Sequence, residues 1–106
     1  MITYEDFSKI ELKIAKIIDA REHPSADRLY ILDIDLGGEK RQIVAGIRNH
    51  YAIQELIGKN IAVVCNLQPA LIRGIESNGM LLAASSGNEL SILTIEKDLP
   101  AGAMIR

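Results

Sequence analysis

The chain has 106 residues, of which 48% are hydrophobic and 25% are charged, and its formal net charge is −2. This length suits one domain with a modest core and excludes a catalytic domain joined to a separate substrate domain. The composition is that of a folded globular chain, and no apolar run approaches the roughly 18 residues of a membrane span. The slight acidity excludes a partner held mainly by overwhelming positive charge.

The N-terminal stretch MITYEDFSKIELK has acidic residues where a secretory signal needs a basic start and an apolar run, so we expect a cytoplasmic protein. TYEDF predicts a short helical turn capped by Thr3. KIELKIAKIIDA alternates apolar and charged residues, which predicts a long strand. The alternation breaks around Ala15 and Lys16 and is expected to resume at Ile18, which indicates a bulge or a sharp coil.

The following residues predict four more strands and one short helix. EHPSAD is a turn, because Pro24 restricts the preceding residue to extended geometry. Gly37 and Gly38 predict a tight hairpin between the strands LYILDIDL and KRQIVAGI, and AIQELIG predicts a helix that Gly58 ends. NIAVVCNL and GMLLAA complete the set. This order predicts an all-β fold, a five-stranded Greek-key OB barrel with its short helix between strands three and four.

We therefore expect a single domain over residues 1–106, with the barrel at about 9–84 and a C-terminal extension at 85–106. The extension is too apolar for a solvated tail. Its large apolar side chains are Leu90, Ile92, Leu93, Ile95, Leu99, Met104 and Ile105. They must pack on their own barrel or on a second copy of the chain.

Enzyme motifs fail in this sequence. Gly74 and Gly79 have phosphate-loop spacing, but Met80 and Leu81 stand where a lysine and a hydroxyl residue would be needed. Ser77 lacks the glycine that a nucleophile elbow requires two residues before it. The two histidines and the lone cysteine are too few and too scattered for a typical zinc site. We expect no catalytic activity, no cofactor and no metal.

A binding function is better supported. OB barrels bind ligands across strands two and three, between the loop that joins strands one and two and the loop that joins strands four and five. The first loop, REHPSADR, and the second, within NLQPALIRGIESNGMLLAA, are expected to bring basic and hydrogen-bonding groups to one end of the barrel. These groups are Arg21, His23, Arg28, Asn66 and Arg73, and the face is extended by Lys13, Lys16 and Arg41. Arginine suits phosphate oxygens because its planar fork can donate two hydrogen bonds at once.

The aromatic count favours a folded RNA over an extended single strand. Single-strand binders stack bases on rings, whereas this chain has no Trp, one Phe and three Tyr.

Structural alternatives stay open for several site residues. Arg73 could be a solvated loop charge, His23 a turn residue, Ser77 a partner of a neighbouring backbone group and Met80 a core residue.

Several segments together resemble one known family over nearly the whole chain. They are DFSKIELKIAKI, HPSADRLYILDIDLG, RQIVAGI, IGKNIAVVCNLQPALIRGIESNGMLLAA and LPAGAMIR. The sequence is similar to the tRNA-binding domain that occurs at the end of methionyl-tRNA synthetases, in free-standing tRNA-binding proteins and in synthetase-associated cofactors of eukaryotes. The most specific part is the pattern NLxPxxxRGxxSxGMLLA.

The resemblance implies an OB barrel that recognises tRNA by structure and presents it to an aminoacyl-tRNA synthetase. The tRNA-binding residues it implies are Lys13, Lys16, Arg28, Arg41, Asn66, Arg73, Ser77 and Met80. It also implies a homodimer, with an interface formed by Phe7, Leu90, Ile92, Leu93 and Ile95. Relatives usually have glycine at the position of Ala15 and serine at the position of Ala45. Two alternatives are a dimeric peptide-binding, chaperone-like protein of the same fold and a synthetase-docking subunit.

Overall fold

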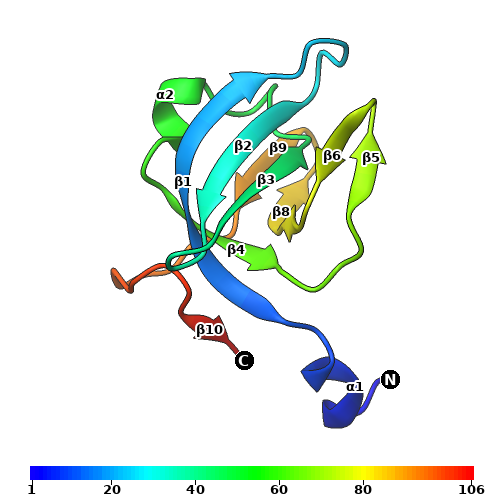
Figure 1. The fold of residues 1–106 in the computed structure, drawn as a ribbon, viewed down its shortest axis with the longest axis vertical. Helices are drawn as coiled ribbons and strands as arrows, with labels where there is room; N and C mark the ends of the chain where they lie inside the picture. The colour runs from blue at the N-terminus through cyan, green and yellow to red at the C-terminus, as the bar shows by residue number, and fades with distance from the viewer.

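The barrel is built around β1 (Leu12–Glu22), the longest strand in the computed structural model, which describes residues 1–106 (Figure 1). Antiparallel neighbours flank it in a sheet of order β3-β2-β1-β4-β7, and a further short strand, β10, pairs with the start of β1. The other strands of this sheet are β2 (Tyr30–Asp35), β3 (Lys40–Ala45), β4 (Asn60–Val64), β7 (Met80–Leu81) and β10 (Met104–Ile105). The structure confirms the expected OB-like barrel.

A bulge bends β1, but it lies later than the sequence indicated. The register of β1 against β2 shifts between Ile17 and Asp19. Ile17 is fully buried and Ile18 is exposed, so the expectation that the apolar alternation resumes at Ile18 is wrong. The interruption near Ala15 has another cause: Ala15 faces the core, while Ile14 is buried on the opposite face, where its backbone bonds to Ala103 and Gly102.

The core consists of inward-facing residues from every long strand. Its fully buried large side chains are Ile17, Leu32, Ile34, Ile43, Ile61 and Val63 from the strands, together with Ile47 and Leu56. Tyr30 belongs to the same core as Leu32 and Ile34 of β2, and its hydroxyl donates to the Tyr51 carbonyl at 2.7 Å. Because that buried hydroxyl is satisfied, the ring can be buried at little cost.

Two short helices flank the barrel. In α1 (Tyr4–Ser8) the Thr3 hydroxyl accepts from the Asp6 N–H and the Asp6 carboxylate accepts from the Thr3 N–H, which confirms Thr3 as the cap. No residue of α1 is buried, and the helix projects from the barrel as an arm (Figure 1). By contrast, α2 (Ile53–Leu56), which ends just before Gly58, plugs the barrel with Leu56.

The fifth predicted strand, GMLLAA, is in fact divided. β7 pairs with β4, and the chain then turns into β8 (Ala83–Ser86), which pairs with β9 (Glu89–Ile92) as a separate hairpin. The preceding segment was expected to be an irregular loop. Instead it contains another hairpin, formed by β5 (Ala70–Ile72) and β6 (Ile75–Ser77).

The C-terminal extension packs on its own barrel. Ile92 is only 6% exposed and lies in the core cluster, and Leu90 packs against that cluster. Further along, Gly102 lies so close to the β2–β3 hairpin that a Cβ on it would stand 2.7 Å from the Leu36 carbonyl oxygen. For at least Ile92 and Leu90, the intramolecular alternative is therefore correct.

The β2–β3 hairpin turns at Gly37 and Gly38, both of which have positive φ, as their pairing predicts. The Asp35 carboxylate accepts from the N–H groups of both glycines at 2.9 Å. The N–H groups of Gly38 and Gly37 hold the pKa of Asp35 below its ordinary value, with a smaller effect from Lys40 and Lys16. This stabilisation is therefore present above the unfolded carboxyl pKa and is lost as the pH falls through the lowered one.

We expect Gly37→Ala to destabilise the fold more than Gly38→Ala. A Cβ at Gly37 would stand 2.5 Å from the Ala101 carbonyl oxygen, whereas a Cβ at Gly38 meets nothing within 4 Å. The φ angles are +88° and +99°, so both variants carry similar backbone strain. The free energies of unfolding of the two variants, measured with urea, should differ by about 1–3 kcal/mol. This difference reports the contact between residue 37 and the Ala101 carbonyl. Equal losses would show that the C-terminal turn moves away without cost.

Candidate nucleic-acid interface

The loop between β1 and β2 lies against the tip of the β5–β6 hairpin, as the upper part of Figure 1 shows. The hairpin turns on Arg73 (φ 51°) and Gly74 (φ 84°). Two successive positive φ angles are the requirement of the tight hairpin turn that matches strand twist. Arg73 is the only non-glycine residue with positive φ in the chain, so the fold holds this side chain at the tip against a backbone preference.

The two loops are joined by hydrogen bonds. His23 is 3% exposed, and its Nδ1 accepts from the Ser25 N–H at 3.1 Å. Its Nε2 lies 3.0 Å from the Ile72 carbonyl oxygen, across the gap between the loops. Arg73 returns the contact, since its Nη2 donates to the Ser25 carbonyl at 2.9 Å. His23 is thus a turn residue, but one that also reaches the second loop.

Arg28 and Arg73 line one hollow of about 370 Å³ at this joined end, together with Ala26, Asp27 and Leu29. Neither arginine forms an ion pair with a carboxylate, and Arg28 is exposed. Arg73 donates one hydrogen bond to a carbonyl group, which is neutral and therefore leaves the guanidinium charge uncompensated. The end of the barrel therefore offers two guanidinium groups to an anion.

Ser77 closes the barrel. Its hydroxyl accepts from the Val44 N–H at 2.9 Å and donates to the Gly79 carbonyl at 3.0 Å, and the residue is 3% exposed. The bond to Gly79 is the contact with a neighbouring backbone group that the sequence left open, whereas Val44 lies 33 residues away in the chain. Ser77 can support a binding surface by fixing β6 beside β3, while its own hydroxyl is occupied.

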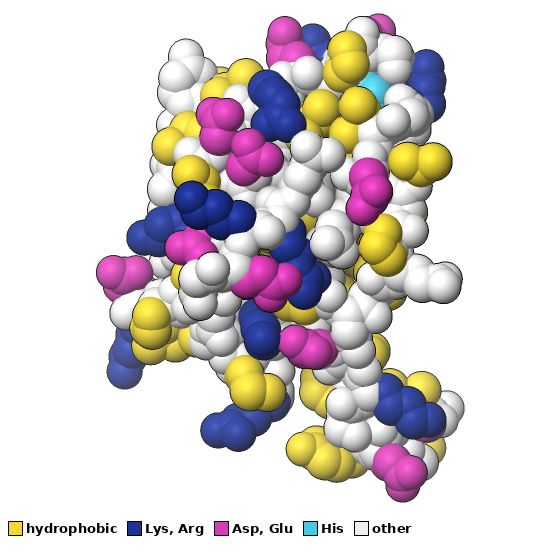
Figure 2. Space-filling model, viewed as in Figure 1, with side chains coloured by type: hydrophobic (Ala, Val, Ile, Leu, Met, Phe, Trp, Pro, Cys, Tyr) yellow, Lys and Arg dark blue, Asp and Glu magenta, His cyan; other side chains and the backbone are white.

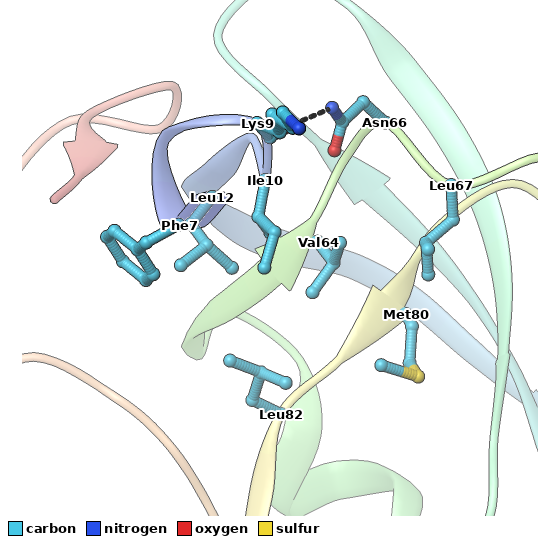
Figure 3. A pocket seen from close by; sticks show the side chains of 9 residues that line it. All are labelled: Phe7, Lys9, Ile10, Leu12, Val64, Asn66, Leu67, Met80 and Leu82. Carbon is cyan, nitrogen blue, oxygen red and sulfur yellow. Dashed lines mark hydrogen bonds between the residues drawn. The ribbon is translucent and has the colours of Figure 1, made fainter. Parts of the chain in front are cut away.

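Asn66 lies away from Arg28 and Arg73, at the junction of α1 and β1. Its Oδ1 accepts from the Glu11 N–H at 2.8 Å. Its Nδ2 donates to the Lys9 carbonyl at 2.7 Å, the bond drawn in Figure 3. The expectation that Asn66 joins the basic groups at one end is wrong, because its amide holds the arm onto β4.

Met80 is 47% exposed and faces an apolar groove beside the arm. The groove has a volume of about 550 Å³, and apolar side chains from α1, β1, β4 and β7 point into it (Figure 3). Its lining residues are Phe7, Lys9, Ile10, Leu12, Val64, Asn66, Leu67, Met80 and Leu82. Met80 is therefore only partly a core residue, because its half-exposed side chain also borders the groove.

The remaining basic positions differ in how free their charge is. Lys13 pairs with Glu11 at 3.2 Å. Arg41 pairs with Glu39 at 2.9 Å, and its Nη1 donates to the Cys65 carbonyl, so that its side chain is only 16% exposed. Lys16, in the middle of β1, is exposed and has no ion-pair partner within 4.0 Å. Of these three predicted contacts on the strands, Lys16 is the one without an ion-pair partner.

Positive and negative side chains alternate over the face formed by β1, β2 and β3 (Figure 2). Arg21 pairs there with Asp33 at 3.0 Å and with the Gln42 amide oxygen at 3.0 Å. A mixed face of this kind gives little long-range attraction. Among the predicted contacts, the cations left without an ion-pair partner for an anion are Lys16, Arg28 and Arg73.

Two residues that the sequence did not single out hold the basic end together. Arg48 donates to the Ala26 carbonyl and to Glu22 at 2.7 Å, which fixes both sides of the first loop. Gln42 donates from its Nε2 to the Glu76 carbonyl at 2.9 Å, which fixes β6. Both act on backbone groups far away in the chain, and no local pattern marks such partners.

No three His, Cys, Asp or Glu side chains gather in a way that could hold a metal ion. Cys65 is buried, and burial raises the pKa of its thiol, so it remains a protonated, weakly reactive group. Neither helix has the length and apolarity to cross a membrane. The chemistry of the site is thus that of hydrogen-bond donors and fixed positive charges.

Residues 12–104 match the model of a family described as "Putative tRNA binding domain". The chain belongs to the tRNA-binding domain family. This domain is 55% identical over 104 residues to a methionine–tRNA ligase of Thermotoga maritima and 45% identical over 105 residues to that of Pyrococcus furiosus. These matches cover 98% and 99% of the domain, but only 16% and 14% of the ligases. It is therefore related to a small part of an enzyme.

Solved structures show the same fold at full length. A MetRS-related protein from Pyrococcus horikoshii superposes with a TM-score of 0.93 at 30% identity, covering 100% of this tRNA-binding domain and 98% of that chain. The CsaA chaperone protein from Picrophilus torridus gives 0.92 at 33% identity, with 100% coverage of both chains. The fold and size are thus shared by proteins with different described roles.

We expect Ser77→Ala to destabilise the domain by about 1–3 kcal/mol, because the buried Val44 N–H loses its acceptor. Urea unfolding measures the change. Ser91→Ala is the matched control, since Ser91 is exposed and its hydroxyl makes only a 3.5 Å contact; its effect should stay within about 0.5 kcal/mol. Equal stabilities for the two variants would contradict the role of Ser77 in closing the barrel.

Proposed function

We propose that this tRNA-binding domain binds tRNA through its shape and its phosphate backbone, with little preference among tRNA species. The observation that carries the proposal is the pair of uncompensated guanidinium groups, Arg28 and Arg73, that line one hollow in a member of this family. Lys16 extends the contact along β1, while Lys13 and Arg41 contribute less because carboxylates already pair with them. Ser77 supports this surface by fixing β6 beside β3, whereas Asn66 and Met80 border the groove beside the arm.

The few rings of the chain favour a folded RNA over an unstacked strand. Tyr30 is buried, and Tyr51 packs against the core with its hydroxyl accepting from the Ile92 N–H. Tyr4 and Phe7 lie on the projecting arm, away from the arginines. No aromatic platform is left beside Arg28 and Arg73, so contacts to phosphate and ribose must supply the affinity.

The domain acts as an accessory to aminoacyl-tRNA synthesis, by presenting tRNA to a synthetase. Its relatives of 55% and 45% identity are parts of methionine–tRNA ligases, which makes a methionyl-tRNA synthetase the preferred partner. No catalytic step is assigned to this chain. A cytoplasmic location, where translation takes place, follows from this role.

Bulk tRNA should bind more tightly than duplex DNA or single-stranded DNA of equal length. Affinity should fall linearly with the logarithm of salt concentration, with a slope that corresponds to roughly three to five neutralised phosphates. Gel-shift titrations at several salt concentrations measure both quantities. A flat salt response, or equal affinity for tRNA and single-stranded DNA, would argue against the proposal.

Arg73→Gly should weaken tRNA binding by about 1–3 kcal/mol, because a charge-assisted phosphate contact is lost. Its effect on stability should be small, since loss of the bond to Ser25 is offset by relief of the positive φ of 51°. Arg106→Gly, a change of equal charge at the exposed end of the chain, is the control. Unchanged binding by a folded Arg73→Gly variant would leave Arg73 as a solvated loop charge.

The homodimer expected from the resemblance is supported by the arm and its groove. Met1, Ile2 and Tyr4 are exposed on the arm, and the groove beside it is apolar. Of the interface residues, Phe7 lines the groove, Leu93 is 40% exposed and Ile95 is half-buried. Ile92 and Leu90 serve their own core, so the contact between copies must rely on the other three.

Sedimentation at micromolar concentration should give about twice the chain mass of 11.6 kDa. Phe7→Asp should reduce it to the mass of one chain, because burial of a carboxylate in the apolar groove costs several kcal/mol. Ile57→Asp, at an exposed position beside α2, is the control and should leave the dimer intact. A wild-type monomer at this concentration would end the dimer proposal.

A second candidate function is binding of an apolar peptide or a synthetase segment in the groove. It is favoured by the groove of about 550 Å³ and by the likeness to CsaA chaperone structures. Apolar contacts respond weakly to salt, whereas phosphate contacts respond steeply. The salt titration that tests tRNA binding therefore separates the two candidates.

A further inference from the structure

The contact between the first loop and the β5–β6 hairpin is a closed set of three hydrogen bonds centred on residues 23–25. The Ser25 N–H bonds to His23, His23 bonds to Ile72, and Arg73 bonds back to Ser25. The buried His23 side chain, which is 3% exposed, thus lies beside the bond between Ser25 and Arg73 and links the same two segments. We call this set the clasp.

The tautomer of His23 follows from its partners. Nδ1 faces an N–H donor, so it must be the acceptor. Nε2 then carries the proton and donates to the Ile72 carbonyl oxygen, 3.0 Å away. Both ring nitrogens are therefore used within the chain, and the imidazole joins two loops that the sheet does not connect.

The hairpin needs such a tether. β5 and β6 form a two-stranded sheet of their own with three residue pairs, and Leu71 at its outer side is 75% exposed. Isolated two-stranded hairpins are marginally stable in water. Ser77 fixes the base of the hairpin, at the end of β6, whereas the clasp is what fixes the tip that carries Arg73.

We propose that His23 is a positioning residue for RNA binding, because it holds Arg73 beside Arg28 so that both guanidinium groups contact a single backbone phosphate. This inference rests on the proposed tRNA-binding function. The hollow they line contains two arginines and one carboxylate, Asp27, which leaves one net positive charge for one phosphate. A phosphate between the two arginines would also relieve their mutual repulsion.

Two substitutions of His23 each retain one of its two hydrogen bonds and remove the other. His23→Gln places an amide N–H at the reach of Nε2 and retains the tether to Ile72. His23→Asn places an oxygen at the reach of Nδ1 and retains only the turn within the first loop. Amide hydrogen exchange over residues 70–77 reports the tether without any RNA. It should be faster in His23→Asn and close to wild type in His23→Gln.

Affinity for bulk tRNA should fall about tenfold in His23→Asn and stay within about threefold of wild type in His23→Gln. In an Arg73→Gly background, His23→Asn should cause no further loss, because nothing remains to position. This non-additivity separates positioning from general damage to the fold, which would persist in that background. If neither variant keeps slow exchange, the comparison in the Arg73→Gly background still decides.

The single phosphate is tested by salt dependence. In the double variant Arg28→Ala, Arg73→Gly, the slope of log affinity against log salt should fall by the amount that corresponds to about one neutralised phosphate. A fall that corresponds to two phosphates would indicate that each arginine contacts its own phosphate. Wild-type affinity in His23→Asn, or an undiminished loss in the Arg73→Gly background, would overturn the role of His23. A wild type that binds no tRNA would end the proposed function itself, and this inference with it.

Discussion

Closure of the barrel depends on the contact between β3 and the end of β6, in which the Ser77 hydroxyl takes part. β3 and β7 are the two ends of the sheet order, and no strand ladder joins them. The gap is bridged by the Val44 N–H donating to Ser77 Oγ and by the Asn78 N–H donating to the Gln42 carbonyl. Ser77 in turn donates to Gly79, where an added Cβ would stand 3.2 Å from a backbone oxygen of Val64. Glycine at position 79 therefore allows a close approach to β4, where any side chain would be tightly packed.

The position of the proposed binding surface follows from this closure. Once Ser77 fixes the end of β6, the hairpin stands beside the first loop, and its tip can reach His23 and Ser25. The segment between β4 and β7 therefore has a structural role in addition to its proposed function. It carries the groups that seal the barrel at its base and the cation that faces solvent at its tip.

Much of the fold was predictable because its signals are local. The cap at Thr3 depends on residues a few positions apart, and so does the turn at Gly37 and Gly38. The roles of Ser77 and Asn66 were not predictable, because their partners are backbone groups 33 and 55 residues away. Likewise, the charge pattern of one sequence does not reveal that Glu11 and Glu39 neutralise two of the expected tRNA contacts.

The close backbone approach between Gly102 and the β2–β3 hairpin has a consequence for how this domain can be attached to other proteins. It keeps the last residues beside the start of β1, so that both chain ends leave the barrel at the same extremity (Figure 1). The loop with Arg28 lies at the opposite extremity of a molecule 39 Å long. A protein joined covalently at either chain end would therefore lie at the end of the barrel opposite to the loop with Arg28, and it would leave that loop accessible.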